Sequence, residues 1–285
     1  MNLEQLPKSG LAAVALFLTL IGASASAHWQ PRDDWAAIFD QAGVAGTIAV
    51  LDLRQGEHLG FVHNAERVRV PFIPASTFKV PHTLFALDAG VVADEFEILE
   101  WDGEPRWLDT WNQDQDLRSA MRNSVVWVYQ GFARAIGEER SRDYLKRLDY
   151  GNADPSDGIG RYWIDGELRI SAIEQIEFLR KLYFNELPFR VEHQRLVKDL
   201  IINAATPACI LRAKTGWTTA PEPDIGWWVG WIESPRGPVF FALNIDMPRG
   251  RADAPRRLSI TRNVLRTLGD PGSPGPADCI EQTLP

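Results

Sequence analysis

Apolar residues near both ends of the chain follow the pattern of β-strands. The segments are short, rich in β-branched and aromatic residues, and bounded by glycine or proline turns. Between the first two segments, Gly56 can take the positive φ that a hairpin turn at residues 54–57 requires. The predicted strands are residues 47–53 and 59–62 near the amino terminus, and 211–214, 226–233 and 239–247, an antiparallel meander, near the carboxyl terminus.

The middle of the chain, from about residue 95 to 207, has helical periodicity and little strand signal. Ser171 and Glu174 match a capping box, in which each side chain binds a backbone amide left free at a helix start. A further helix-compatible stretch runs from residue 76 to about residue 90. The predicted helices are residues 34–41, 116–136, 141–148, 171–184 and 256–268.

Strands at both chain ends with helices between them predict a mixed α/β fold of the α+β type. The expected architecture is an antiparallel sheet built from both chain ends and flanked by helices, with an inserted helical lobe. We expect one domain at residues 28–285, with sheet segments 28–94 and 208–270, the lobe at about 95–207, and a tail rich in proline and glycine at 271–285.

Residues 1–27 have the features of a signal peptide. Lys8 precedes an apolar run at residues 11–21, and Ala25-Ser26-Ala27 supplies the small residues of a cleavage site. A membrane anchor is the weaker alternative, because a span needs about 20 apolar residues and this run is shorter. The mature chain is therefore expected to start near His28, to be periplasmic or secreted, and to have no stable membrane insertion.

The composition argues against two kinds of partner. A formal net charge of −8 is unfavourable for nucleic-acid binding, which requires a basic face. The five histidines have no close metal-ligand spacing, so no metal site is expected.

Cys209 and Cys279 are the only cysteines. They either form a disulfide, which would attach the tail to the rest of the domain, or remain free or differently paired.

Three short segments carry candidate chemistry. Ser76-Thr77-Phe78-Lys79 opens a helix-compatible stretch, and residues three apart share a helix face, so Lys79 can reach the Ser76 hydroxyl. Free amides at the helix start can hold an oxyanion. Ser124-Val125-Val126 begins another helical stretch, and Lys214-Thr215-Gly216 lies on a predicted strand, where glycine leaves room for a planar ligand. Singly, each segment is equally well explained as a helix cap, a surface lysine or a strand end.

In this order and within this α/β layout the three segments are specific, and the chain resembles the class D serine β-lactamases, the oxacillinases. The resemblance implies the penicillin-recognising fold, a serine hydrolase acting on cyclic amides, and a small β-lactam substrate. Tyr150 and Asn152 either line the site or form a structural turn. Further similar segments extend the match over most of residues 70–260: Trp101-Asp102-Gly103, Trp111-Asn112-Gln113-Asp114, Tyr150-Gly151-Asn152 and Trp163-Ile164-Asp165-Gly166.

The chain departs from the class A β-lactamase pattern in a way that affects the base. It has Ser-Val-Val where class A has Ser-Asp-Asn, and no Glu-x-x-Leu-Asn segment, so the duty of base is expected to fall on Lys79. Burial among Phe78, Val126 and Trp163 would lower the lysine pKa, because burial disfavours the charged form. The resemblance implies that carbon dioxide then forms a covalent carbamate on Lys79, held by the Trp163 indole, with no separately bound cofactor.

The resemblance also implies a cycle of covalent catalysis. Ser76 forms an acyl-enzyme, with carbamylated Lys79 as general base in both acylation and deacylation. The backbone amides of Ser76 and Trp217 hold the oxyanion. Ser124 passes a proton to the departing ring nitrogen, with Lys214 shifting its pKa.

The residues expected to bind the substrate are Lys214, Thr215 and Gly216 on the predicted strand, together with an arginine on the last helix. Arg256 and Arg257 are adjacent, and counting back from Ser259-Ile260 favours Arg257. A solvated cation at the helix start is the alternative. His82 suits core packing better than catalysis, and the tryptophans at 227, 228 and 231 alternate along a strand, as sheet packing requires.

Two other functions use the same motifs. A β-lactam sensor domain is acylated without turnover, and a low-molecular-weight penicillin-binding protein acts on peptidoglycan peptides. The apolar Val126 and Trp163 near the lysine favour the carbamate route and therefore the hydrolase. The sequence leaves the substrate spectrum and the oligomeric state open.

Overall fold

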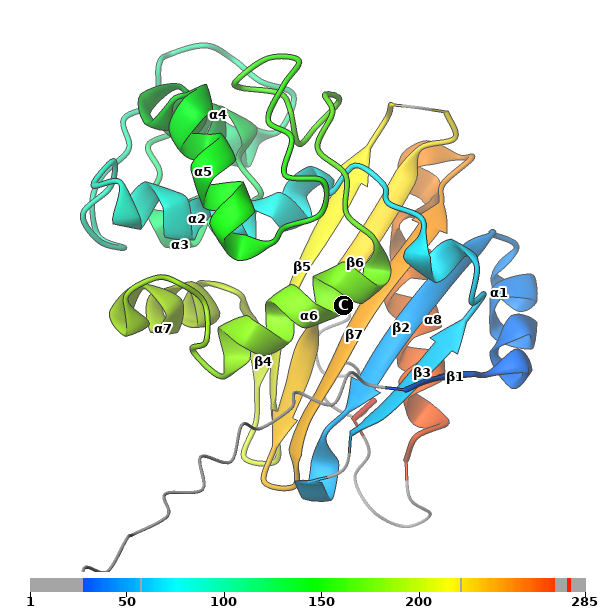
Figure 1. The fold of residues 1–285 in the computed structure, drawn as a ribbon. Coiled ribbons are helices and arrows are strands. Elements are labelled where there is room, and N and C mark those ends of the chain that lie inside the picture. Colours follow the sequence, from blue (N-terminus) through cyan, green and yellow to red (C-terminus); the bar gives the residue numbers. More distant parts are fainter. Residues whose placement is uncertain (1–27, 57, 221, 270–275, 278–285) are drawn as a thin grey trace, which may run out of the picture.

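A seven-stranded sheet forms the centre of the molecule, in the order β1-β3-β2-β7-β6-β5-β4 (Figure 1). The computed structural model describes residues 28–56, 58–220, 222–269 and 276–277. β2 pairs directly with β7, so the two chain ends form one sheet, as the sequence predicts. The strands are β1 (Trp29–Pro31), β2 (Gly46–Asp52), β3 (Leu59–His63), β4 (Ile202–Ala205), β5 (Ile210–Thr218), β6 (Ile225–Ser234) and β7 (Gly237–Asp246).

The sheet is antiparallel with one exception. β1 pairs with β3 in parallel and is an addition to the antiparallel sheet that we expected. β1 has three residues and β4 has four, and both are absent from the sequence prediction. Strands this short show too little periodicity to be recognised. β4 falls within the range expected to be helical, yet it extends the sheet beyond β5.

Helices cover both faces of the sheet. α1 (Ala36–Ala42) and α8 (Ala254–Arg266) lie on one face, and α6 (Ala172–Tyr183) crosses the other (Figure 1). The lobe contains α3 (Leu117–Arg122), α4 (Val126–Ile136), α5 (Glu138–Leu148) and α7 (Val191–Leu200). α2 (Lys79–Asp88) precedes the lobe in the sequence and packs against α4 and α7. Short 3-10 turns are η1 (Asp33–Trp35), η2 (Arg54–Gly56), η3 (Arg67–Arg69), η4 (Ala75–Phe78), η5 (Asp109–Trp111) and η6 (Gly250–Asp253).

The sheet separates two hydrophobic cores. One core lies between the sheet and α1 with α8, and the other lies between the sheet and the lobe helices. Along β6, Trp227 and Trp231 belong to the lobe-side core whereas Trp228 belongs to the opposite one, because successive strand residues point to opposite faces. The tryptophans therefore pack the sheet, as predicted.

The helix predicted at residues 116–136 is in fact two helices, α3 and α4. Ser124 lies between them with a φ of 55°. Positive φ is unfavourable for a residue with a β-carbon and interrupts a helix. α7 is also absent from the sequence prediction, and its buried residues are Gln194, Val197 and Leu200. The capping box predicted at Ser171 is present at the start of α6.

Some predicted features lie outside the described residues, namely the signal peptide at 1–27, Cys279 and most of the tail. Cys209 is disulfide-bonded. Within the described ranges, no helix is both long and apolar enough to cross a membrane. The same part of the chain contains no group of three His, Cys, Asp or Glu side chains suited to a metal ion.

Candidate active site

Ser76 and Lys79 lie next to each other where η4 meets α2. Lys79 Nζ is 3.0 Å from Ser76 Oγ, within hydrogen-bond distance. The sequence predicts a helix starting at Ser76, but the structure has a 3-10 turn there and the α-helix begins at Lys79. In a 3-10 turn, residues three apart eclipse each other. This geometry brings the two side chains together.

The turn that carries Ser76 is held by its neighbour Thr77. Thr77 Oγ1 donates to the Pro74 carbonyl at 2.7 Å and accepts from Gln175 Nε2 at 2.9 Å. Gln175 is buried on α6, one residue after Glu174 of the capping box. Sequence analysis did not single out Gln175. A polar residue on the apolar face of an amphipathic helix is the signal that points to it.

Lys79 is fully buried, and no carboxylate of the described residues lies within ion-pair distance of it. Burial first, and the charge of Lys214 second, lower the pKa of Lys79 well below its usual value. Its Nζ lies 5.1 Å from the centroid of the Tyr129 ring. Because the neutral form is favoured, this lysine can accept a proton.

Tyr129 is a neighbour of Lys79 that sequence analysis missed. Its hydroxyl lies 2.9 Å from Thr83 Oγ1, which donates to the Lys79 carbonyl. Tyr129 follows Val126 by three residues on α4, a spacing that places both on one helix face. That spacing was the available signal.

The apolar surroundings predicted for Lys79 are partly present. Phe78 and Trp163 are fully buried, with ring centroids 5.8 Å apart. Val126 is only half-buried at the start of α4. The Trp163 Nε1 is buried and has no hydrogen-bond partner among the described residues. An unsatisfied buried donor is costly, so this N–H is suited to an acceptor that binds beside it.

Ser124 and Lys214 bring the lobe and the sheet together. Lys214 Nζ donates to Ser124 Oγ at 3.0 Å and to the Thr215 carbonyl at 3.1 Å. Burial, followed by the charge of Arg257, lowers the pKa of Lys214 to about 7. A cavity of about 460 Å³ between α3, α7 and β5 opens beside Lys214 and Thr215.

Gly216 has a different purpose from the one we predicted. A β-carbon at this position would lie 2.9 Å from the Pro74 carbonyl and 3.1 Å from Thr77 Cγ2. Glycine is therefore required so that β5 can approach η4, and η4 fills the room that we expected a planar ligand to use. The close approach also brings Trp217 of β5 near the turn that carries Ser76. The Trp217 indole itself donates to Asp224 at 2.8 Å.

The structure distinguishes the two adjacent arginines on α8. Arg257 is buried and donates to the Gly216 carbonyl at 2.7 Å, beside the Lys214 segment. Burial lowers the pKa of Arg257 to about 10. Arg256 instead donates to the Ala42 carbonyl at 2.7 Å, at the end of α1. The favoured candidate, Arg257, is therefore the one that lies at β5.

Tyr150, Gly151 and Asn152 form a structural turn. Tyr150 is buried in ring contact with Phe78 and Phe178. Asn152 is exposed, and its side chain binds the backbone of residues 167 and 169. Of the two alternatives left open by the sequence, the turn is the one observed.

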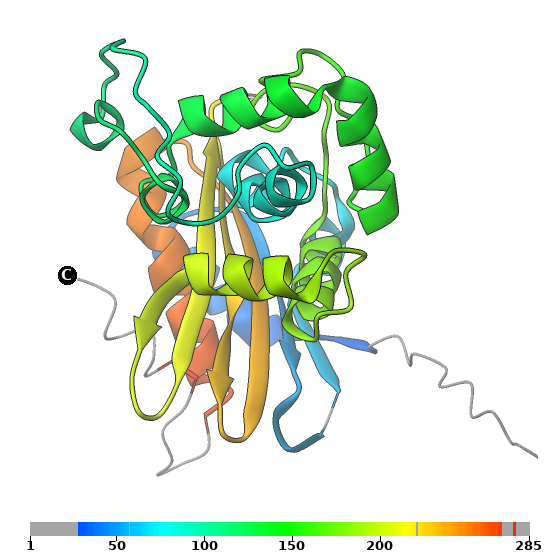
Figure 2. The same cartoon turned by 90° about the vertical axis from the view of Figure 1, so that its left-hand side faces the viewer.

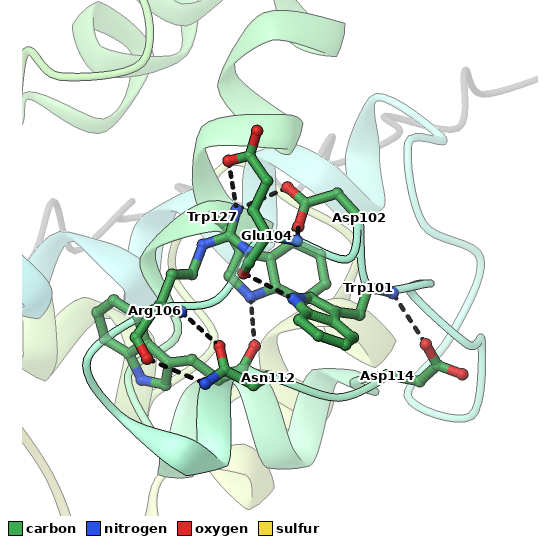
Figure 3. A network of polar contacts seen from close by, with 8 residues as sticks. Trp101, Asp102, Glu104, Arg106, Asn112, Asp114 and Trp127 are labelled. Carbon is green, nitrogen blue, oxygen red and sulfur yellow. Dashed lines mark hydrogen bonds and ion pairs between the residues drawn. The ribbon is translucent and has the colours of Figure 1, made fainter.

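The Trp101 and Trp111 motifs form a polar network in the loop before α3 (Figure 3). Arg106 pairs with Asp102, and the Arg106 backbone exchanges hydrogen bonds with the Asn112 side chain at 2.7 and 2.9 Å. Asp114 accepts from the Trp101 amide at 2.8 Å. These polar residues shape the loop instead of contacting Ser76.

His82 packs in the core as predicted. Its ring lies within 5.7 Å of the ring centroids of Phe78, Tyr129 and Trp163. Burial, and then the charge of Lys79, lowers the pKa of His82 to about 3. The imidazole is therefore neutral at physiological pH.

Comparison with known proteins agrees with this geometry. Residues 46–266 match the family model described as the penicillin binding protein transpeptidase domain. The fold and the site thus define a protein of the penicillin-recognising class.

Individual relatives narrow that class. The chain is 58% identical to β-lactamase OXA-3 of Pseudomonas aeruginosa over 86% of this chain and 88% of the relative. It is 56% identical to β-lactamase OXA-2 of Salmonella typhimurium, over 89% and 92%. The solved class D β-lactamase YbXI from Nostoc is 43% identical, with a TM-score of 0.79 covering 82% of this chain and 98% of that one. The chain therefore belongs to the class D β-lactamase family, as its motifs predict.

Proposed function

We propose that this protein hydrolyses the β-lactam ring of penicillin-type antibiotics through a Ser76 acyl-enzyme. The observation that carries the proposal is the Ser76 Oγ, 3.0 Å from the Nζ of a fully buried lysine. A serine hydroxyl is a weak nucleophile until an adjacent base takes its proton. Lys79, with its lowered pKa, is such a base.

In acylation, Ser76 Oγ attacks the lactam carbonyl carbon while Lys79 accepts the hydroxyl proton. The backbone amides of Ser76 and Trp217 are the donors proposed for the developing oxyanion. The lactam C–N bond then breaks, and Ser124 gives a proton to the ring nitrogen. Lys214 Nζ lies 3.0 Å from Ser124 Oγ and is proposed to assist the transfer by shifting the pKa of the Ser124 hydroxyl.

The surroundings of Lys79 fit a covalent carbamate formed with carbon dioxide. The neutral amine is the form that reacts, and the unpartnered Trp163 Nε1 is a donor suited to hold the new anion. When present, the carbamate would supply a carboxylate-type base at the same place for acylation and for deacylation. Phe78 and the half-buried Val126 would limit access of water to that place.

The substrate carboxylate is proposed to bind Lys214, Thr215 and Arg257. These residues place two cationic side chains along β5, with Arg257 at the Gly216 carbonyl and a cavity beside Lys214 and Thr215. A negatively charged ligand would also raise the pKa of Lys214 again, because an opposite charge favours the ammonium form.

We further propose that the chain is exported and acts in the periplasm or outside the cell, which amino-terminal sequencing of the secreted protein tests.

Steady-state hydrolysis of a simple penicillin tests the function. We expect multiple turnovers in degassed buffer that increase when bicarbonate is added. Isotope-labelled bicarbonate followed by NMR should show a lysine carbamate independently of activity. Consumption of one equivalent followed by a stable acyl-enzyme in both buffers would contradict hydrolysis and indicate a sensor or penicillin-binding protein.

A further inference from the structure

Trp107 is an aromatic side chain that remains 64% exposed in the loop before α3. The loop around it is fixed, because the Arg106 backbone and the Asn112 side chain bind each other in both directions (Figure 3). Arg106 also lies 5.4 Å from the centroid of the Trp127 ring. An exposed aromatic ring held in place by a fixed loop offers a flat surface on which another ring can stack.

Trp107 has ring contacts on two sides. The Arg251 guanidinium lies 5.5 Å from its ring centroid, and the Trp111 ring lies 6.0 Å away at 60°. Arg251 belongs to η6, which leads into α8. The contact therefore joins the loop of the lobe to the other side of the sheet, and Figure 2 shows this loop beside the start of α8.

These contacts reach the candidate active site from both directions. On the lobe side, the Trp111 indole donates to the Asn123 carbonyl at 2.9 Å, immediately before Ser124. On the sheet side, a β-carbon built on Gly250 would lie 3.9 Å from the Trp217 ring. The contacts of Trp107, Trp111 and η6 thus extend from the residue before Ser124 to Trp217 of β5, and they border the site between these two residues.

This part of the site is the one at which the substrate carboxylate is proposed to bind. Arg251 and Arg257 lie on adjoining elements, η6 and α8. A bicyclic β-lactam whose carboxylate is held by Arg257 would have the adjoining η6, with Arg251 and its contact to Trp107, on the same side of the site. Within the described residues, the Arg251 guanidinium has no carboxylate at ion-pair distance. Its charge is thus available to an aromatic ring or to a ligand.

We propose that Trp107 and Arg251 form a clasp that determines specificity by binding a flat aromatic substituent on the carboxylate-bearing ring of the substrate. The exposed indole provides a stacking surface. The guanidinium adds the attraction of a cation for the face of an aromatic group. The clasp rests on the proposed hydrolytic function and extends it to a substrate class.

Two cephalosporins with the same acyl side chain test the clasp. One carries an aromatic heterocycle on the carboxylate-bearing ring and the other carries a methyl group. For the aromatic compound, Trp107→Ala and Arg251→Ala should each raise KM about three- to tenfold, the range expected for one aromatic contact, while kcat stays constant. KM for the methyl compound should not change.

The matched control is Phe96→Ala, which removes another exposed aromatic side chain, 72% exposed, from the segment between α2 and α3. It should leave both KM values unchanged. The double variant Trp107→Ala/Arg251→Ala should be little worse than the stronger single variant, because both residues act on one substituent. A KM ratio for the two compounds that stays within about twofold of the wild-type ratio in all three clasp variants would overturn the proposal.

Calorimetric binding to a Ser76→Ala protein separates the clasp from hydrolysis. Tighter binding of the aromatic compound, lost when Trp107→Ala is added, supports the clasp whatever the turnover. Equal binding of the two compounds in both proteins refutes it. Absence of turnover by the unaltered protein with either compound would count against the proposed function alone.

Discussion

The two buried lysines of the site are the same chemical group in two different environments. Lys79 lies at the start of α2, fully buried against the Tyr129 ring of the lobe, with the Ser76 hydroxyl as its hydrogen-bond partner. Lys214 lies on β5, binds two oxygen atoms and borders a cavity. The pKa of Lys79 is lowered well below its usual value, whereas the pKa of Lys214 is lowered to about 7.

The difference shows how packing assigns the two roles. In both cases burial is the largest cause of the shift, and a neighbouring cation is the second. A lysine whose pKa is lowered by full burial favours the neutral form, which can act as a base. A lysine with a pKa near 7 is about half charged, so an anionic substrate can draw it to the ammonium form.

The largest expected effect comes from removing Lys79. Lys79→Ala should lower kcat by about a thousandfold or more, because general bases contribute about 10² to 10⁴ and this one is proposed for both steps. Steady-state hydrolysis measures the loss, and thermal unfolding checks that the variant is folded. Lys146→Ala on the exposed face of α5 is the control. A Lys79→Ala protein that still deacylates at the normal rate would remove the proposed base.

Replacing the Trp163 indole tests the proposed carbamate site at Lys79. Trp163→Phe keeps most of the apolar volume but removes the N–H, so kcat should fall about 10- to 100-fold, the value of one hydrogen bond to a charged group. Added bicarbonate should restore part of the activity. Trp231→Phe is a closely matched control, since it also removes a buried indole N–H without a described partner, from β6. Equal losses in the two variants would indicate a packing effect.

The two adjacent arginines of α8, Arg256 and Arg257, test the sheet side of the site. Arg257→Ala should raise KM for penicillins about tenfold, because it removes one charge-assisted contact to the substrate carboxylate. Arg256→Ala removes a cation of the same type that faces α1, and KM should be unchanged. If the two variants had similar KM values, the carboxylate would not be bound by Arg257.

The smallest expected effect is a dependence on pH. Because the pKa of Lys214 is about 7 in the free protein, its ammonium form is lost as the pH rises through that value. Binding of the carboxylate should weaken accordingly, and KM should rise by up to about fivefold between pH 7 and pH 8. In Lys214→Arg the charge persists, so KM should be flat over this range although kcat falls. A flat wild-type profile would contradict the role of Lys214.

Local sequence patterns predicted much of the fold. Short apolar segments bounded by glycine or proline turns located β2, β3, β6 and β7, and a capping box marked the start of α6, because these signals depend on neighbours along the chain. The order of the three motifs identified the family, which the comparisons confirm. Roles for Ser76, Lys79 and the other site residues stay predictions until the variants above are measured.

Other features depend on residues that are distant in the sequence. The Ser124–Lys214 hydrogen bond joins residues 90 positions apart, and the Gln175–Thr77 bond joins residues 98 apart. The helix spacing of Tyr129 and the polar character of Gln175 were visible in the sequence, but neither signal names the residue that each side chain contacts. The reason for Gly216 became visible only with η4 packed against β5. The sequence supplies the two lysines and their order along the chain. Their lowered pKa values come from burial and from nearby charges, and both arise only when the lobe packs against the sheet.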